Sequence, residues 1–413
     1  MEKKNLTEGA SASPLWATLE TFARQEIQAF IQRLLEQEVT DLLGRRKSCR
    51  RGLVAPTPGY RNGYGKPRRL TLSNGTITLS RPRVRGLEER FVSRVLPLFQ
   101  RRTREVGAVL PELYLHGLAQ GDFTLALRGL LGDGAPLSAS SIARLTAGWA
   151  AEYRAWRERS LGELEVVYLW ADGLYVKAGL EDTKAALLVV IGALSDGRKV
   201  VLAVEPGQRE STTSWAEVLR SLKARGLAAP RLTVADGHLG LWSALAQVYP
   251  ESAEQRCWNH RSVNILDAVP LKHQPEVRTA LRAIAYAATR AEAERLRTCF
   301  AKQYRARFPK AVERLEHDWE RLVAYYAFPQ EHWRHLRTTN VVESPFDAVR
   351  LRTTAAKRFK KVENGSAMIW KLLLLAEQSF RRLNAPELLP AVYAGAKYVD
   401  GIAVKVRPGR LAA

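Results

Sequence analysis

Two segments of the sequence run through apolar residues into the tripeptide Ala-Asp-Gly, YLWADGLYV with Asp172 and RLTVADGHLGLWSAL with Asp236. A third isolated acid, Glu343, lies in a basic segment with eight Lys or Arg residues between Arg334 and Lys361. A single Asp-Gly dipeptide is most often an ordinary turn. Two of them at the ends of apolar strands, together with an acid in a basic segment, instead indicate carboxylates gathered around divalent ions.

Three carboxylates of this kind predict phosphoryl transfer on nucleic acid. In-line cleavage or joining of a phosphodiester requires charge neutralisation on the attacking and the leaving oxygen, which two metal ions about 4 Å apart provide. Mg²⁺ prefers carboxylate and water oxygens, so three acids suffice where the nucleic acid supplies further oxygens. We therefore expect Asp172, Asp236 and Glu343 to be catalytic residues and ligands of two Mg²⁺ or Mn²⁺ ions.

The elements that would position these acids alternate between strand and helix from residue 164 onward. ELEVVYLWA (163–171), AALLVVIGAL (185–194) and KVVLAVEPG (199–207) predict three consecutive strands. SWAEVLRSLKARG predicts a helix that opens at Ser214, with Glu217 in capping-box spacing, and closes at Gly226. RLTVA, LGLWSALAQVY, AEQRCW and RSVNILDAV then continue as strand, helix, strand and helix.

This order is that of a ribonuclease H-like α/β core, in which helices cover a mixed sheet and the first and fourth strands are adjacent. Asp172 and Asp236 would then meet at the carboxyl ends of those strands. A doubly wound nucleotide-binding fold is disfavoured, because no Gly-rich phosphate turn follows the first strand.

Helical periodicity interrupts the core further along the chain. EVRTALRAIAYAATRAEAERLRTCFAKQYRARF and the segment after it are rich in Ala, Arg and Glu. We expect the first part of the core over 161–269, an all-helical insertion over 270–332 and the last part of the core over 333–385. The helix SAMIWKLLLLAEQSFRRL closes the core, and 386–413 is a C-terminal tail.

The N-terminal region is mainly helical with one basic β-hairpin. Residues 16–43 carry apolar residues at helical spacing up to Gly44, and the following alternation turns at Asn74-Gly75, which suits a two-residue hairpin turn. The net charge of the chain is +22, and residues 45–104 hold 17 Lys or Arg against only Glu88 and Glu89. Such a block indicates a polyanionic partner, and double-stranded DNA is the expected one.

Residues 105–160 predict two short helices, a turn at Asp133-Gly134 and a Ser-capped helix, an arrangement similar to a helix-turn-helix. A plain helical bundle is the alternative for this segment, and the neighbouring charge favours DNA binding. Residues 1–104 and 105–160 together form the expected DNA-binding region, whose candidate contacts are Arg68, Arg69, Arg81, Arg83, Ser140, Ser141 and Arg144.

Membrane association is disfavoured by the same residues. The first 14 residues hold no apolar core of a signal peptide, and the longest apolar run (185–194) is too short to span a bilayer. Cys49, Cys257 and Cys299 are scattered and make no disulfide framework. We expect a cytoplasmic protein.

The quoted motifs also resemble those of a known family, the Mutator-like DDE transposases of bacterial insertion sequences. The resemblance is carried by YLWADGLYVKAG, LTVADGHLGLWSAL, QRCWNHRSVNIL and RTTNVVESPFDAVRLRT, and by the hairpin segment, over residues 15–385. It implies an enzyme that cleaves at terminal inverted repeats and joins the freed 3′-hydroxyl to target DNA. Pairing of two transposon ends would make the protein a homodimer.

Three further residues are expected to support the site. Cys257 and His260 form a Cys-x-x-His pair, which is half of a zinc site without a second pair, so a supporting role is favoured over zinc. Arg350 would share a helical face with Glu343 if the chain is helical from Asn340 onward. Asp347 is the rival third acid, or the cap of a helix that begins near Ser344-Pro345.

Two other functions use the same features. One is a non-catalytic DNA-binding protein descended from such an enzyme, which the intact acid triad disfavours. The other is a nuclease or junction resolvase that cleaves without joining, and only a joining assay separates it from a transposase.

Overall fold

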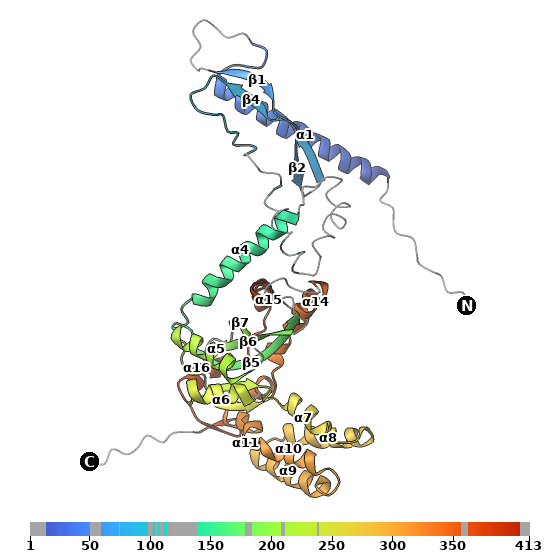
Figure 1. Ribbon diagram of the computed structural model, residues 1–413, viewed down its shortest axis with the longest axis vertical. Coiled ribbons are helices and arrows are strands. Elements are labelled where there is room, and N and C mark those ends of the chain that lie inside the picture. Colours follow the sequence, from blue (N-terminus) through green and yellow to red (C-terminus); the bar gives the residue numbers. More distant parts are fainter. Residues whose placement is uncertain are drawn as a thin grey trace, which may run out of the picture. The chain divides into compact units, whose positions relative to one another are not determined.

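The computed structural model describes residues 14–49, 59–73, 75–97, 102–103, 139–177, 184–207, 211–237, 239–356 and 362–404, with single positions between 106 and 115. The chain divides into two compact units, residues 1–145 and residues 146–413. Figure 1 labels their elements. We describe each unit by itself.

The first unit packs one long helix against a β-hairpin. Helix α1 (Pro14–Leu43) ends at Gly44, whose φ of 63° is the left-handed conformation that glycine adopts readily. Strands β2 (Arg68–Leu72) and β3 (Gly75–Leu79) are antiparallel, and the pairing of Leu72 with Gly75 places the turn where Asn74-Gly75 predicts it. Strands β1 (Tyr60–Tyr64) and β4 (Pro82–Arg85) form a second antiparallel ladder. The core between helix and hairpin consists of Leu35, Leu70, Ile77, Leu79 and Leu96.

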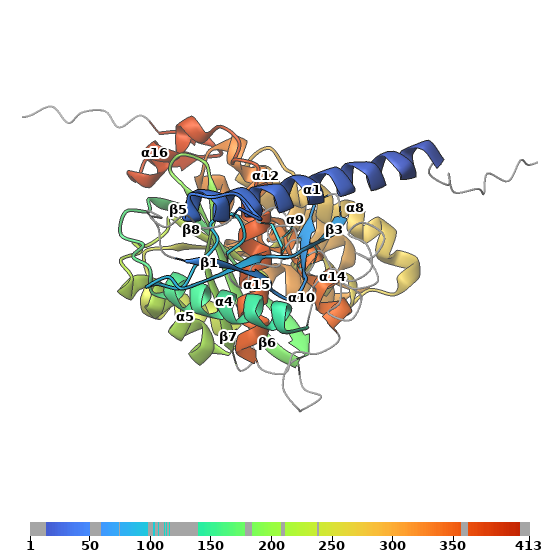
Figure 2. The same ribbon diagram turned by 90° about the horizontal axis from the view of Figure 1, so that it is seen from above.

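Helix α1, the long blue helix of Figure 2, carries two apolar faces. Ile27 and Ile31 pack with the hairpin core. Outside that contact the helix exposes 53% of Leu19, 58% of Phe22, 54% of Phe30 and 38% of Leu34. A single amphipathic stripe, as the sequence predicts for this helix, would bury its large apolar residues on one side. The residues instead divide between a core face and an outer face.

The second unit contains a five-stranded mixed sheet in the order β7-β6-β5-β8-β9. Strands β5 (Val166–Lys177), β6 (Lys184–Leu194) and β7 (Lys199–Gly207) form an antiparallel meander. Strands β8 (Leu232–Ala235) and β9 (Ala253–Arg256) continue the sheet in parallel with β5. The first and fourth strands of this unit are therefore neighbours, as the strand and helix order predicts.

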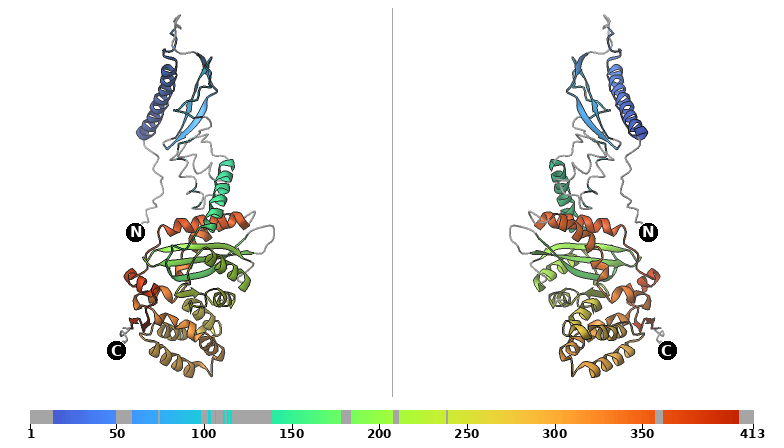
Figure 3. Two further views of the ribbon diagram at one scale, coloured as in Figure 1. Left: turned by 90° about the vertical axis from the view of Figure 1, so that its left-hand side faces the viewer. Right: turned by 90° about the vertical axis from the view of Figure 1, so that its right-hand side faces the viewer.

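Helices cover both faces of the sheet (Figure 3). Helices α5 (Thr212–Ala224) and α6 (Leu239–Val248) bury Trp215, Leu219 and Trp242 against one face, in a cluster with Leu169 and Val190. On the other face α15 (Val362–Glu377) packs against β7. Helix α4 (Ala139–Glu158) is tied to the same strand, because the Tyr153 hydroxyl donates to the Val204 carbonyl oxygen at 2.5 Å. The result is an α/β/α arrangement with the sheet as its central layer.

After helix α7 (Trp258–Leu266), every described element up to residue 332 is helical. These are η1 (Leu271–His273), α8 (Gln274–Ala285), α9 (Arg290–Tyr304), α10 (Pro309–His317), α11 (Trp319–Leu322), η2 (Ala324–Ala327) and η3 (Gln330–His332). Helices α12 (Trp333–Leu336), α13 (Asn340–Glu343) and α14 (Phe346–Ala356) lead back to the sheet. The chain ends with η4 (Pro386–Leu388), α16 (Leu389–Tyr393) and the short pair β10 (Tyr398–Val399) and β11 (Ile402–Ala403).

Two local predictions were wrong in detail. Helix α5 is capped by Ser211, whose side chain accepts from the Ser214 N–H, so the helix begins earlier than the capping-box spacing of Ser214 indicates. Strand β5 continues past Asp172 to Lys177, because Asp172 stays paired with Val189 of β6. Pairing along a whole neighbouring strand outweighs the turn preference of an Asp-Gly dipeptide.

The predicted helix-turn-helix lies largely outside the described residues. Of its candidate contacts, Ser140, Ser141 and Arg144 lie in the first turns of α4. Elsewhere, none of the helices that the structure describes is both long and apolar enough to cross a membrane. Cys49, Cys257 and Cys299 are all free thiols, as their scatter in the sequence predicts.

Candidate functional site

Asp172 and Asp236 occupy adjacent positions on neighbouring strands. The parallel register of β5 and β8 ends with Ala171 opposite Ala235. Asp172 is the next residue of β5, and Asp236 directly follows the last residue of β8. Neighbouring strands lie about 4.8 Å apart, so the two acids start from neighbouring backbone positions. Both residues are half-buried, which leaves each carboxylate access to solvent. The Asp172 Oδ1 atom accepts from the Gly173 N–H at 2.8 Å.

The turn after Asp236 requires glycine. Gly237 has a φ of 103°, in the region that residues with a side chain rarely adopt. The chain can therefore leave β8 sharply at this point, and Asp236 remains at the end of the sheet instead of being carried away in a longer strand.

Glu343 reaches the same end of the sheet from α13, which packs against β5 and β6. Its side chain is 30% exposed, and its Oε1 atom accepts from the Thr339 hydroxyl and lies 3.7 Å from His260 Nδ1. Thr339 is fully buried, and its carbonyl oxygen also accepts from the Glu343 N–H at 3.1 Å. One residue thus fixes both the backbone and the carboxylate of Glu343.

Cys257 and His260 link β8 to α13. The Cys257 N–H donates to the Ala235 carbonyl oxygen at 2.7 Å, directly before Asp236. The Cys257 Sγ atom is buried and accepts from the Thr339 N–H at 3.4 Å. The hydrogen bond to Cys257, with the charges of Cys257, Glu343 and Asp236, raises the pKa of His260 to about 9 against the opposing effect of burial. At neutral pH His260 is therefore a cation 3.7 Å from the Glu343 carboxylate.

Residues that could bind a metal ion at this end of the sheet include a thiol and an imidazole as well as the expected carboxylates. Among the described residues, one group of three brings its ligand atoms within 4.8 Å of one another, namely Cys257, His260 and Glu343. The three expected acids do not all approach one another that closely. Their oxygens nevertheless suit a hard ion such as Mg²⁺, and two ions held side by side need a wider ligand set than a single ion does. The carboxylates of Asp172 and Asp236 are the type of ligand that the expected ions prefer.

The structure separates Arg350 from Glu343. Helix α13 ends at Glu343, Ser344 and Pro345 break the helix, and α14 begins at Phe346. Arg350 and Asp347 are exposed on α14 and form an ion pair at 3.1 Å. The continuous helix that would align Arg350 with Glu343 is therefore absent.

Candidate DNA contacts of the first unit lie on its hairpin. Arg69 on β2 and Arg83 on β4 are exposed, and Arg68 and Arg81 are half-buried. Arg83 donates to the Asn62 carbonyl oxygen at 3.3 Å and Arg68 to the Pro97 carbonyl oxygen at 3.4 Å. These contacts leave the charges at the surface.

Trp170, Trp242, Trp258 and Trp333, four Trp residues of the second unit, are all buried. Trp170 and Trp242 lie in the core of the second unit. Trp258 and Trp333 are no more than 3% exposed, and their Nε1 atoms each donate to a carbonyl oxygen at 2.8 Å. Both rings therefore belong to the core and are not exposed platforms for stacking on a base.

Sequence reasoning missed Thr339. Its position four residues before Glu343 was the available signal, because residues at that spacing share a helical face.

The fold and this arrangement define an α/β protein with acidic side chains from β5, β8 and α13 at one end of a mixed sheet. Comparison with known proteins then gives the family. The family model described as "Transposase, Mutator family" matches residues 2–381, and the chain belongs to this family.

Individual relatives agree with the family. The chain is 45% identical over 293 residues to the transposase for insertion sequence element IS6120 of Mycolicibacterium smegmatis, covering 71% of this chain and 91% of the relative. It is 43% identical over 279 residues to the transposase for IST2 of Acidithiobacillus ferrooxidans, covering 67% and 94%. It is also 31% identical over 368 residues to the transposase for ISRM5 of Rhizobium meliloti, covering 87% and 89%.

Proposed function

We propose that this protein cleaves DNA at the terminal inverted repeats of an insertion sequence and joins the 3′-hydroxyl ends to target DNA by two-metal phosphoryl transfer. The observation that carries the proposal is the register of β5 and β8, which makes Asp172 and Asp236 neighbours. The strand order, with its helical segment between Asp236 and Glu343, supports a ribonuclease H-like core of the DDE type.

In this proposal Asp172, Asp236 and Glu343 hold two Mg²⁺ or Mn²⁺ ions. When bound, the ions neutralise charge on the attacking and leaving oxygens of the phosphodiester. Thr339 holds the Glu343 carboxylate in one orientation through its hydroxyl. His260 adds a positive charge beside that carboxylate, which draws the DNA phosphates toward the site.

The DNA itself would be held by the first unit. We propose that the exposed Arg residues of the hairpin contact phosphates of the terminal repeats, and that α4 with the segment before it reads base edges. The charge excess of residues 45–104 supports this assignment. A cytoplasmic protein bound to the bacterial nucleoid is consistent with it.

The test is a repeat-cleavage and strand-joining assay. Asp172→Asn and Asp236→Asn each remove a charge with little change of shape, and should abolish metal-dependent cleavage and joining while repeat binding is retained. The matched control is Asp196→Asn, an exposed acid in the turn after β6, which should behave as wild type. Cleavage without any joining would identify a nuclease instead, and cleavage by both site variants at wild-type rates would refute the proposal.

We also propose that the protein acts as a homodimer through the outer face of α1. A second copy of α1 laid antiparallel on the first would place Leu19 opposite Leu34 and exposed Glu20 opposite exposed Arg33, so apolar and charged residues match. Combining Phe22→Ser with Phe30→Ser should then shift the mass measured by light scattering toward the monomer. Val263→Ser, which alters an exposed apolar residue of the second unit, should leave it unchanged.

A further inference from the structure

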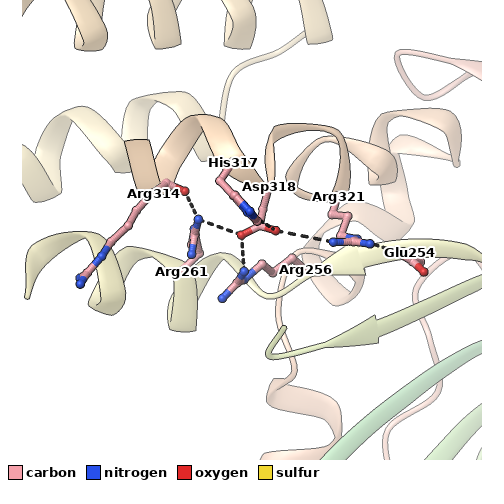
Figure 4. A network of polar contacts seen from close by, with 7 residues as sticks. All are labelled: Glu254, Arg256, Arg261, Arg314, His317, Asp318 and Arg321. Atoms are coloured by element: carbon pink, nitrogen blue, oxygen red, sulfur yellow. Dashed lines mark hydrogen bonds and ion pairs between the residues drawn. The ribbon is translucent and has the colours of Figure 1, made fainter. Parts of the chain in front are cut away.

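A buried charge network joins the edge strand β9 to the helical segment that follows it (Figure 4). Asp318, between α10 and α11, has a side chain that is only 2% exposed. Its Oδ2 atom contacts Arg256 of β9 and lies 2.8 Å from Arg261 of α7, and its Oδ1 atom lies 3.7 Å from Arg321. Arg321 in turn pairs with Glu254 of β9. An acid this deeply buried is held in place by its cationic partners.

Gln255, which lies between Glu254 and Arg256 on β9, is also hydrogen-bonded to the residues around α11. Gln255 is fully buried, donates to the Leu322 carbonyl oxygen at 3.2 Å and accepts from the Tyr325 N–H at 2.8 Å. Three consecutive side chains of β9 are therefore fixed by the residues around α11, on a strand at the edge of the sheet.

Arg256 also touches the turn that carries Asp236. It lies opposite Ala235 in the register of β8 and β9, and its guanidinium packs against Gly237. A Cβ atom added to Gly237 would lie 2.4 Å from both Nε and Cζ of Arg256. The Arg256 side chain is 11% exposed, and its Nε has no hydrogen-bond acceptor among the described residues. The guanidinium is thus clamped between Asp318 on one side and the Gly237 turn on the other.

We infer that Arg256 is a positioning residue for Asp236, and that Asp318 holds Arg256 in place for this task. Without Asp318, the planar guanidinium has no anchor and no longer supports the turn. In the intact protein, the helical segment that contains Asp318 therefore sets the position of Asp236 through the Arg256 side chain. The inference rests on the proposed function for its catalytic meaning, and the contact itself is independent of it.

Hydrogen exchange of the full-length chain, without metal or DNA, tests the contact. Arg256→Gln and Asp318→Asn should each raise the exchange rate of amides in the turn that follows β8 by tenfold or more. The double variant should exchange no faster than the faster single variant, because the two residues act in series. Arg305→Gln breaks an exposed ion pair with Glu316 in the same helical segment and should change nothing at the turn.

A second readout links the contact to the site. In Arg256→Gln the Mn²⁺ concentration that gives half-maximal binding, measured by water proton relaxation, should rise at least fivefold. Unchanged exchange at the turn, or an equal increase in peptides of β6 and β7, would overturn the inference, since the effect would then be absent or global. Wild-type protein that binds no Mn²⁺ and cleaves no DNA would instead refute the proposed function. The exchange experiment would still test the contact between Arg256 and the turn, because it uses neither metal nor DNA.

Discussion

Thr339→Val offers a sharp test of how the third carboxylate is held. Valine has nearly the shape of threonine, and the Thr339 side chain is fully buried, so the change removes a hydroxyl and little else. The backbone N–H of residue 339 still donates to Cys257 Sγ in the variant. Any effect therefore comes from the hydroxyl.

The hydroxyl has three neighbours and one proton. It lies 3.2 Å from Cys257 Sγ and 3.4 Å from His260 Nδ1, and it contacts Glu343 Oε1. A protonated His260 donates from Nδ1, so the hydroxyl accepts from His260 and gives its own proton to the charged carboxylate. Thr339 thus relays the imidazolium charge to Glu343.

A hydrogen bond to a charged group contributes about 1.5–3 kcal/mol. If all of it orients Glu343 for catalysis, the cleavage rate should fall roughly 10- to 150-fold, since about 1.4 kcal/mol corresponds to a factor of ten. Single-turnover cleavage of a labelled repeat end at saturating metal measures the rate, and Thr339→Ser, which keeps the hydroxyl, should recover most of it. Wild-type rates in Thr339→Val, or an equal loss in Thr339→Ser, would refute this reasoning.

Three further predictions concern other parts of the chain. Cys257→Ser and His260→Ala should lower activity or thermal stability, and purified wild-type protein should contain well under one zinc per chain, because Cys257 Sγ already accepts a hydrogen bond from the Thr339 N–H. Elemental analysis decides this. A fragment of residues 1–160 should bind terminal repeats without residues 161–413, with an affinity that falls steeply as salt rises. Binding to random duplex of equal strength at every salt concentration would reduce it to a non-specific clamp. His332 accepts a hydrogen bond at Nδ1 from the Tyr168 hydroxyl and donates one from Nε2 to the Ala385 carbonyl oxygen. Because burial lowers its pKa, the contribution of neutral His332 to stability is present above pH 6.5 and is lost as the pH falls below that value. His332→Gln should therefore weaken the acid-side dependence on pH of the free energy of unfolding measured with urea.

Much of the second unit can be predicted from residue pattern alone. The strand and helix order follows from apolar runs and turn residues. The adjacency of Asp172 and Asp236 follows once that order is matched to the ribonuclease H-like plan, in which the first and fourth strands are neighbours. The hairpin of the first unit is equally local, since Asn74-Gly75 specifies its turn.

Contacts between distant segments could not be predicted in this way. Arg256 and Asp318 are 62 residues apart, and each one alone is an ordinary charged residue in a basic chain. The division of α1 into two apolar faces depends on where the hairpin packs, which helical periodicity does not specify. Sequence pattern gives the elements, and the contacts that position the acids arise only when those elements pack.

The choice between Glu343 and Asp347 as third acid shows where the two kinds of information meet. Their spacing of four residues would put both on one face of a continuous helix, so the pattern alone leaves the choice open. Pro345 lacks an N–H and ends α13 directly after Glu343, which leaves Glu343 against Thr339 and His260. Asp347 starts a separate helix, is 84% exposed and is paired with Arg350. An acid in that position has no packed neighbour to hold it over the sheet, which is the physical reason to propose Glu343 as the ligand.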